Sequence, residues 1–66
     1  MKALGLTTAE QELVALMLQG LRLKEIAARR SVTLHTVRSQ LAASMAKVGV
    51  HRQSDLIREV LALAQD

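Results

Sequence analysis

The fold of this chain is decided by residues 23–48, which read LKEIAARRSVTLHTVRSQLAASMAKV. The first part consists mostly of Leu, Glu, Ala and Arg, which favour a helix, and we expect one at about 23–30. Residues 30–32 predict a tight turn, after which Thr33 suits the N-cap of a longer helix at about 34–47. A short helix, a tight turn and a longer helix form the helix-turn-helix arrangement.

One further helix on each side of this stretch completes the predicted fold. Thr7 and Glu10 have the spacing of a capping box, which predicts a helix at about 8–19. Ser54 is a candidate N-cap for a last helix at about 55–64. No segment alternates apolar and polar residues with a period of two, so strands are not expected. The sequence therefore predicts an all-α, four-helix fold.

The composition limits what this chain can be. A chain of 66 residues predicts a single domain, residues 1–66. The absence of cysteine excludes disulfides and thiolate metal sites and fits a reducing cytoplasm. His35 and His51 have no carboxylate cluster beside them, so we expect them at the surface, with no metal and no other cofactor.

Several classes of function are disfavoured by what the sequence lacks. No apolar run approaches the roughly 18–20 residues that span a membrane, so no membrane partner is expected. Without Phe, Tyr or Trp, the chain has no stacking platform for single-stranded nucleic acids. No nucleophile–base pair and no glycine-rich phosphate loop is present, and so short a chain offers no cleft of normal size. We therefore expect neither an enzyme nor a small-molecule ligand.

Positive charge is concentrated in the middle of the chain. Residues 27–53 contain five of the nine Lys and Arg residues and none of the six Asp and Glu residues. An ordinary solvated basic face would give the same count. A segregated basic surface on a small domain nevertheless favours a polyanionic partner.

The predicted helix at about 34–47 has two different sides. Val37 and Leu41 belong to an apolar side that we expect to be buried. The opposite side is small, polar and cationic, with His35, Arg38, Ser39, Ala42, Ala43 and Ala46. Small side chains let a helix enter the major groove of DNA, where Arg38 and His35 can reach base edges or phosphates. The same short side chains would also allow close packing against another helix.

Motifs along the chain resemble the LuxR/GerE-type helix-turn-helix family. They are Leu6-Thr7-x-x-Glu10, Lys24-Glu25-Ile26-Ala27, Val32-Thr33-x-x-Thr36-Val37-Arg38 and Lys47-Val48-Gly49-Val50. The resemblance covers about residues 6–64. It implies a three-helix core whose third helix reads the major groove of double-stranded DNA, followed by a C-terminal helix that commonly forms the dimer contact.

The resemblance also implies roles for individual residues. Arg38, Ser39 and Ala42 match base-facing positions of the family. Positions that contact the DNA backbone are matched by Lys24, Thr33, Thr36, Gln40 and Lys47. Four residues depart from the family pattern: Ala9 replaces a usual Arg, Arg30 a usual Leu, Gln40 a common His, and Ser44 a core Ile. We expect Arg30 to extend to solvent or add to the basic surface, and Ser44 to weaken packing.

The predicted last helix carries two adjacent apolar lines. Leu56, Val60 and Leu63 form the first line, which can cover the core. The second line consists of Ile57, Leu61 and Ala64, and we expect it to pair with the same helix of another copy about a twofold axis. Alternatively, both lines are buried on one broad face.

Two functions from different classes follow from these features. The first is sequence-specific binding of double-stranded DNA for bacterial transcription regulation, by a cytoplasmic homodimer. The alternative is a stand-alone protein-interaction module, which antagonises a larger regulator by heterodimerising through the C-terminal helix.

Overall fold

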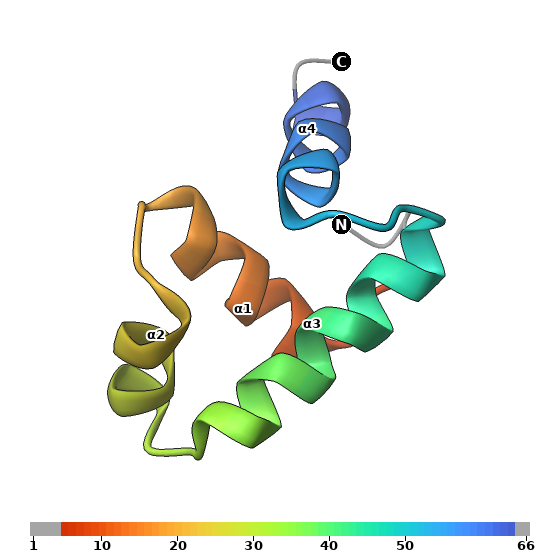
Figure 1. The fold of residues 1–66 in the computed structure, drawn as a ribbon. Coiled ribbons are helices and arrows are strands. Elements are labelled where there is room, and N and C mark those ends of the chain that lie inside the picture. The colour runs from red at the N-terminus through yellow and green to blue at the C-terminus, as the bar shows by residue number, and fades with distance from the viewer. Residues whose placement is uncertain (1–4, 65–66) are drawn as a thin grey trace.

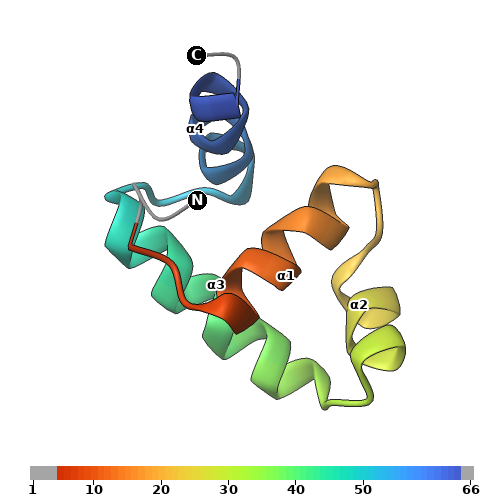
Figure 2. The ribbon, with the colours of Figure 1, turned by 180° about the vertical axis from the view of Figure 1, so that it is seen from behind.

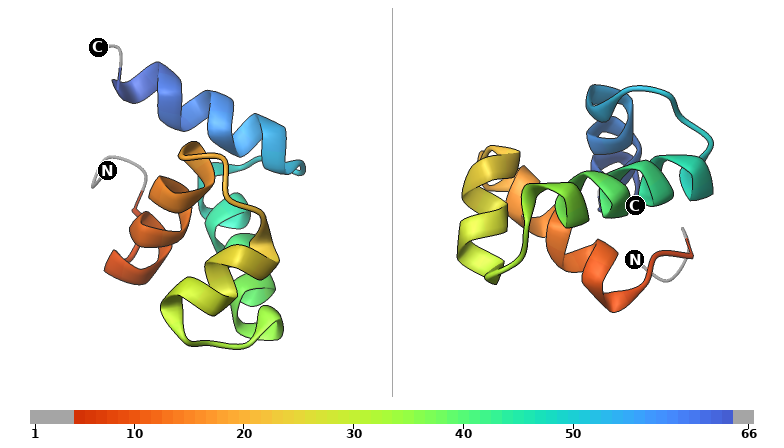
Figure 3. Two further views of the ribbon diagram at one scale, coloured as in Figure 1. Left: turned by 90° about the vertical axis from the view of Figure 1, so that its left-hand side faces the viewer. Right: turned by 60° about the horizontal axis from the view of Figure 1, so that its bottom comes forward.

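The computed structural model describes residues 5–64, and this range contains four helices and no strand (Figure 1). They are α1 (Thr8–Leu18), α2 (Leu23–Arg30), α3 (Leu34–Val48) and α4 (Gln53–Ala64). The helices α1, α2 and α3 pack against one another, and α4 lies across α1 and α3 on the side away from α2 (Figures 2 and 3). The predicted all-α, four-helix fold is confirmed.

Threonine hydroxyls set the starts of α1 and α3. The Thr7 hydroxyl accepts the Glu10 N–H at 3.2 Å, and the Glu10 carboxylate accepts the Thr7 N–H at 2.8 Å, which completes the predicted capping box. The Thr33 hydroxyl accepts the Thr36 N–H at 3.1 Å. Each contact satisfies an N–H that has no partner inside its helix, so both helices begin where the sequence predicts.

The predicted start of α4 was wrong by two residues. The helix begins at Gln53, so Ser54 lies in its first turn and is not the N-cap. The backbone N–H groups of Asp55 and Leu56 both donate to the Arg52 carbonyl at 3.1 Å. The Arg52 guanidinium also donates to the Asp55 carboxylate at 3.0 Å. These contacts favour a helical turn directly after Arg52.

The turn between α2 and α3 is confirmed, and it depends on an unusual backbone conformation. Ser31 has φ +58° and ψ +41°, the left-handed conformation that glycine usually occupies at a helix end. The following N–H, that of Val32, donates to the Ala27 carbonyl at 3.0 Å. A left-handed residue with a Cβ atom costs about 1–2 kcal/mol, so this turn is strained.

Apolar side chains from all four helices form one core. Its fully buried members are Leu13, Val14, Ile26, Val37 and Leu56. Ser44 on α3 is also fully buried, and its hydroxyl donates to the Gln40 carbonyl at 2.8 Å. The polar atom of this core position is therefore satisfied within its own helix.

The two apolar lines of α4 are only partly as predicted. Leu56 and Val60 are buried, but Leu63 is 38% exposed, because the core ends before the last turn of α4. On the second line, Ile57 packs against the core and Leu61 is 44% exposed. The side chain of Ala64, the third member of that line, lies outside the described residues.

Candidate nucleic-acid interface

One side of α3 is exposed and carries the predicted base-facing residues. They are His35, Arg38, Ser39 and Ala42, and all four are exposed. Their spacing places them on neighbouring turns of one helix face. Val37 and Leu41, on the other side, are buried in the core. The structure thus brings the predicted set together on one surface.

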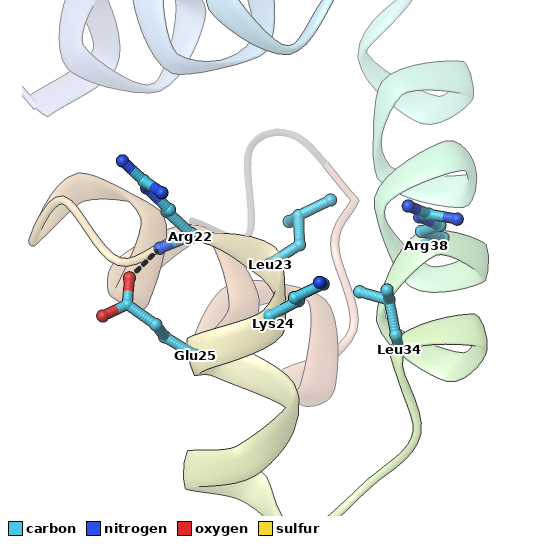
Figure 4. Close-up of a pocket in the computed structure, with 6 residues that line it drawn as sticks. All are labelled: Arg22, Leu23, Lys24, Glu25, Leu34 and Arg38. Carbon is cyan, nitrogen blue, oxygen red and sulfur yellow. Dashed lines mark hydrogen bonds between the residues drawn. The ribbon is translucent and has the colours of Figure 1, made fainter.

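A groove between α2 and α3 borders this face (Figure 4). It is lined by Arg22, Leu23, Lys24, Glu25, Leu34 and Arg38. Figure 4 places Lys24 on α2 and Arg38 on α3, across the groove from each other. The Glu25 carboxylate accepts the Arg22 N–H at 2.7 Å, and so caps the start of α2. Three cations therefore line one groove, at its α2 and α3 walls.

Arg22 is a member of this groove that sequence reasoning missed. It occupies the N-cap of α2 and makes no side-chain capping hydrogen bond, as its residue type predicts. The positive end of the helix dipole disfavours a cation at this position. This unfavourable placement of a cation at a helix start is the feature of the sequence that could have indicated a function for Arg22 other than capping.

The opposite border of the exposed face contains the other predicted backbone-contacting residues. Thr33 and Thr36 lie at the start of α3, with their hydroxyl oxygens 3.0 Å apart. Gln40 is half-buried, and its side-chain oxygen accepts a hydrogen bond from Arg30 at 2.7 Å. The ammonium of Lys47 lies 2.6 Å from the Glu10 carboxylate. The predicted backbone-contacting residues thus occupy both borders, with Lys24 alone on the α2 side.

The contact between Lys47 and Glu10 joins α3 to α1. Glu10 is only 5% exposed, and the hydrogen bond from Lys47 holds the pKa of its carboxyl below the ordinary value. The backbone N–H of Thr7 lowers this pKa further, while burial opposes the shift. Glu10 is consequently charged at neutral pH, and Lys47 neutralises it inside the fold.

Arg30 differs from its prediction because it is drawn back into the fold. Its side chain is only 13% exposed and lies 3.8 Å from the Glu12 carboxylate, besides its hydrogen bond to Gln40. The predicted extension to solvent was wrong, since partners on α1 and α3 hold the guanidinium.

Ion pairs redistribute the positive charge that the sequence places in residues 27–53. Carboxylates from outside that segment pair with three of its five cations, namely Arg30, Lys47 and Arg52. Within residues 5–64, the cations without a carboxylate partner are Arg22, Lys24, Arg29 and Arg38. All four belong to α2, its N-cap or α3, so uncompensated positive charge is concentrated on the helix-turn-helix.

Neither a metal site nor a membrane span is found in the part of the chain that the structure describes. Residues 5–64 contain no group of three His, Asp or Glu side chains that could hold a metal ion. Within the same range, no helix combines the length and the apolar character needed to cross a membrane.

The comparison with known families agrees with this arrangement. The GerE family profile, described as bacterial regulatory proteins of the luxR family, matches residues 4–60. The chain belongs to the luxR family. This luxR-family domain is therefore a helix-turn-helix domain of a family that binds DNA in transcription regulation and is not an enzyme family. Neither the curated proteins nor the solved structures gave a match to the chain.

The family match covers α1, α2, α3 and most of α4. It includes both walls of the Figure 4 groove and the whole exposed face of α3. It ends at Val60, one residue before Leu61. The family assignment thus spans the candidate DNA-binding surface, whereas the last turn of α4 lies beyond it.

Proposed function

We propose that this luxR-family domain binds double-stranded DNA sequence-specifically for bacterial transcription regulation, with α3 in the major groove. The observation that carries the proposal is the exposed face of α3, which presents Arg38 among short side chains and no carboxylate. The major groove of B-DNA is about 12 Å wide and admits a helix of this kind. In a bacterium this function belongs to the cytoplasm, where the DNA is.

Arg38 is the principal base-reading residue in this proposal. Its guanidinium has no carboxylate partner within residues 5–64, so its donors are free for DNA. The forked donors of arginine match O6 and N7 of guanine. His35 adds a second donor, while Ser39 and Ala42 let the α3 backbone come close to the base edges. With so few long side chains, sequence-dependent DNA shape contributes to recognition as well.

In this proposal the two borders of the exposed face of α3 contact the DNA backbone on either side of the major groove. On the α2 border, Lys24 supplies a cation to phosphate, and Arg22 stands beside it. On the other border we assign this role to Thr33, Thr36, Gln40 and Lys47; the Lys47 side chain is paired with Glu10 but remains 38% exposed. Such contacts fix the position of a protein on the duplex, and base contacts then specify the sequence.

A matched pair of arginine variants tests the proposal. Duplexes selected from a random pool serve as the probe, and affinity is measured for Arg38→Ala and for Arg29→Ala. Both variants remove one exposed, unpaired arginine, but only Arg38 lies on the proposed base-facing surface. We expect Arg38→Ala to lose about 1–3 kcal/mol of binding free energy and to relax the sequence preference. Equal losses for the two variants would contradict a base-reading role.

We further propose that the domain binds DNA as a twofold dimer through α4. The outer side of α4 carries a shallow groove lined by Ser54, Ile57, Arg58, Leu61 and Ala62. Leu61 is 44% exposed there, which supports a surface that a second copy covers. A twofold contact of this kind pairs the same side of α4 from both copies, with Ile57, Leu61 and Ala64 at its centre.

Two leucine variants test the dimer. Leu61→Asp introduces a charge in the α4 groove, whereas Leu63→Asp introduces the same charge at a similarly exposed leucine that does not line it. Sedimentation of the protein with DNA should show one copy per duplex for Leu61→Asp and two for Leu63→Asp. Two copies per duplex for both variants would contradict the proposed interface.

The exposed leucines of α4 also favour the second candidate function. In that function, α4 pairs with a larger luxR-family regulator and removes it from DNA. The two candidates differ in what the isolated chain does with duplex DNA. If the chain alone binds no duplex at low salt but captures such a regulator through Leu61, the antagonist function is correct.

A further inference from the structure

A single side chain, Arg30, connects the three helices of the helix-turn-helix core. It is the last residue of α2, and one guanidinium nitrogen donates to the Gln40 side-chain oxygen on α3 at 2.7 Å. The other terminal nitrogen lies 3.8 Å from the Glu12 carboxylate on α1. With only 13% of its side chain exposed, Arg30 is fixed from two directions.

This contact determines which way the Gln40 amide faces. A glutamine side chain has one oxygen that accepts hydrogen bonds and one NH2 group that donates two. Arginine can only donate, so the Gln40 oxygen must face Arg30, and the NH2 group is turned away from it. The NH2 group makes no hydrogen bond to any other residue in the described range 5–64. Gln40 is only half-buried, so these two donors remain available to a ligand.

Gln40 lies at a position where such a donor can meet DNA. Thr36 precedes it by one helical turn, so the two side chains are neighbours along the border of the exposed face of α3. Phosphodiester oxygens of a DNA backbone are acceptors only, and they need donors from the protein. Were the amide reversed, its oxygen would face the phosphate and repel it.

We propose that Arg30 is a positioning residue that presents the Gln40 NH2 group to a phosphodiester of the DNA backbone. Arg30 acts through Gln40 and does not itself contact the phosphate, because its side chain is buried between α1 and α3 and only 13% of it is exposed. The inference rests on the proposed DNA binding, which already assigns Gln40 to the DNA backbone, and adds the residue that orients the Gln40 amide. It assigns Arg30 a role that the charge count alone does not indicate.

A double-mutant cycle tests this role. The full chain and its Arg30→Met, Gln40→Met and double variants are titrated with one duplex of random sequence at low salt. The temperature is one at which circular dichroism shows every variant folded. Each single variant should bind about tenfold more weakly, as expected for a lost hydrogen bond to a charged group. The double variant should bind no more weakly than the weaker single variant, because both changes remove the same contact.

Two further measurements separate positioning from a merely structural effect. The Gln40 side-chain NH2 resonances, assigned by their loss in Gln40→Met, should shift on addition of DNA in the wild-type chain and not in Arg30→Met. The variant Gln40→Glu keeps an acceptor for Arg30 but has no NH2 group. It should therefore melt no lower than the wild-type chain and still bind the duplex at least tenfold more weakly.

The outcomes distinguish this inference from the proposed function. Losses that multiply in the double variant, or unchanged binding by Arg30→Met beside weakened binding by Gln40→Met, would overturn the positioning role while DNA binding stands. A wild-type chain that binds no duplex at low salt would overturn the proposed function and this inference together.

Discussion

The ion pair between Glu10 and Lys47 gives the sharpest stability prediction, for the variant Lys47→Met. The variant leaves a carboxylate that is 5% exposed without its cation, while the Thr7 N–H still donates to it at 2.8 Å. Breaking a fully buried pair costs about 3–5 kcal/mol, and an exposed pair is worth about 0.2–1 kcal/mol. Because the Lys47 side chain is 38% exposed, we expect an intermediate loss of about 2 kcal/mol.

A loss of this size is large for so small a domain. It corresponds to a melting temperature lower by roughly 8–16 °C. The chain has no aromatic residue, so unfolding in urea is followed by far-ultraviolet circular dichroism rather than by fluorescence.

The control is the same change in a Glu10→Gln background. A neutral amide still accepts the Thr7 N–H but needs no cation, so Lys47→Met should cost less than about 1 kcal/mol there. An equal loss in both backgrounds would show that the lysine contributes through packing and would refute the charge argument. A loss below about 0.5 kcal/mol in the wild-type background would refute it as well.

Three further predictions concern single residues. Because the folded-state pKa of Glu10 is lowered, its contribution to stability is complete above its unfolded pKa of about 4.3 and is lost as the pH falls through the folded pKa. The urea midpoint should therefore drop in acid below about pH 4.3, and Glu10→Gln should flatten that drop; an unchanged acid profile in the variant would disprove the assignment. Ser31→Val should lose about 1–2 kcal/mol and Ser31→Gly should stay within about 0.5 kcal/mol of the wild type, since glycine relieves the strain but adds freedom to the unfolded chain. Similar losses for these two variants would mean that the turn is not strained. Ser44→Ala should leave the melting temperature unchanged or raise it, because alanine is the better helix former and leaves no buried donor. A free energy of unfolding lower by more than about 1 kcal/mol would show that the hydroxyl is needed.

Local chemistry explains why most of the fold could be predicted from the sequence. Thr7 and Thr33 define the starts of α1 and α3 through contacts within three residues of the chain. The start of α4 was missed because the segment between α3 and α4 allows a second way to begin the helix. In it, the Arg52 carbonyl accepts backbone N–H groups and the Arg52 guanidinium pairs with Asp55. Periodicity placed Leu63 on the core side of α4, but periodicity contains no information on where the core ends.

The candidate site was predictable in its residues but not in its electrostatics. Helical spacing alone brought His35, Arg38, Ser39 and Ala42 to one exposed face, as predicted. The contact between Glu10 and Lys47 joins residues 37 positions apart, and only the fold brings them together. For this reason the sequence overstated the free charge of residues 27–53.

DNA binding itself is the central claim, and selection of duplexes from a random pool at about 50 mM salt tests it most directly. We predict that the selected duplexes share an inverted repeat. We also predict that their affinity falls steeply with added salt, as counterion release from contacted phosphates requires. Failure to enrich any duplex at this salt concentration would contradict the account.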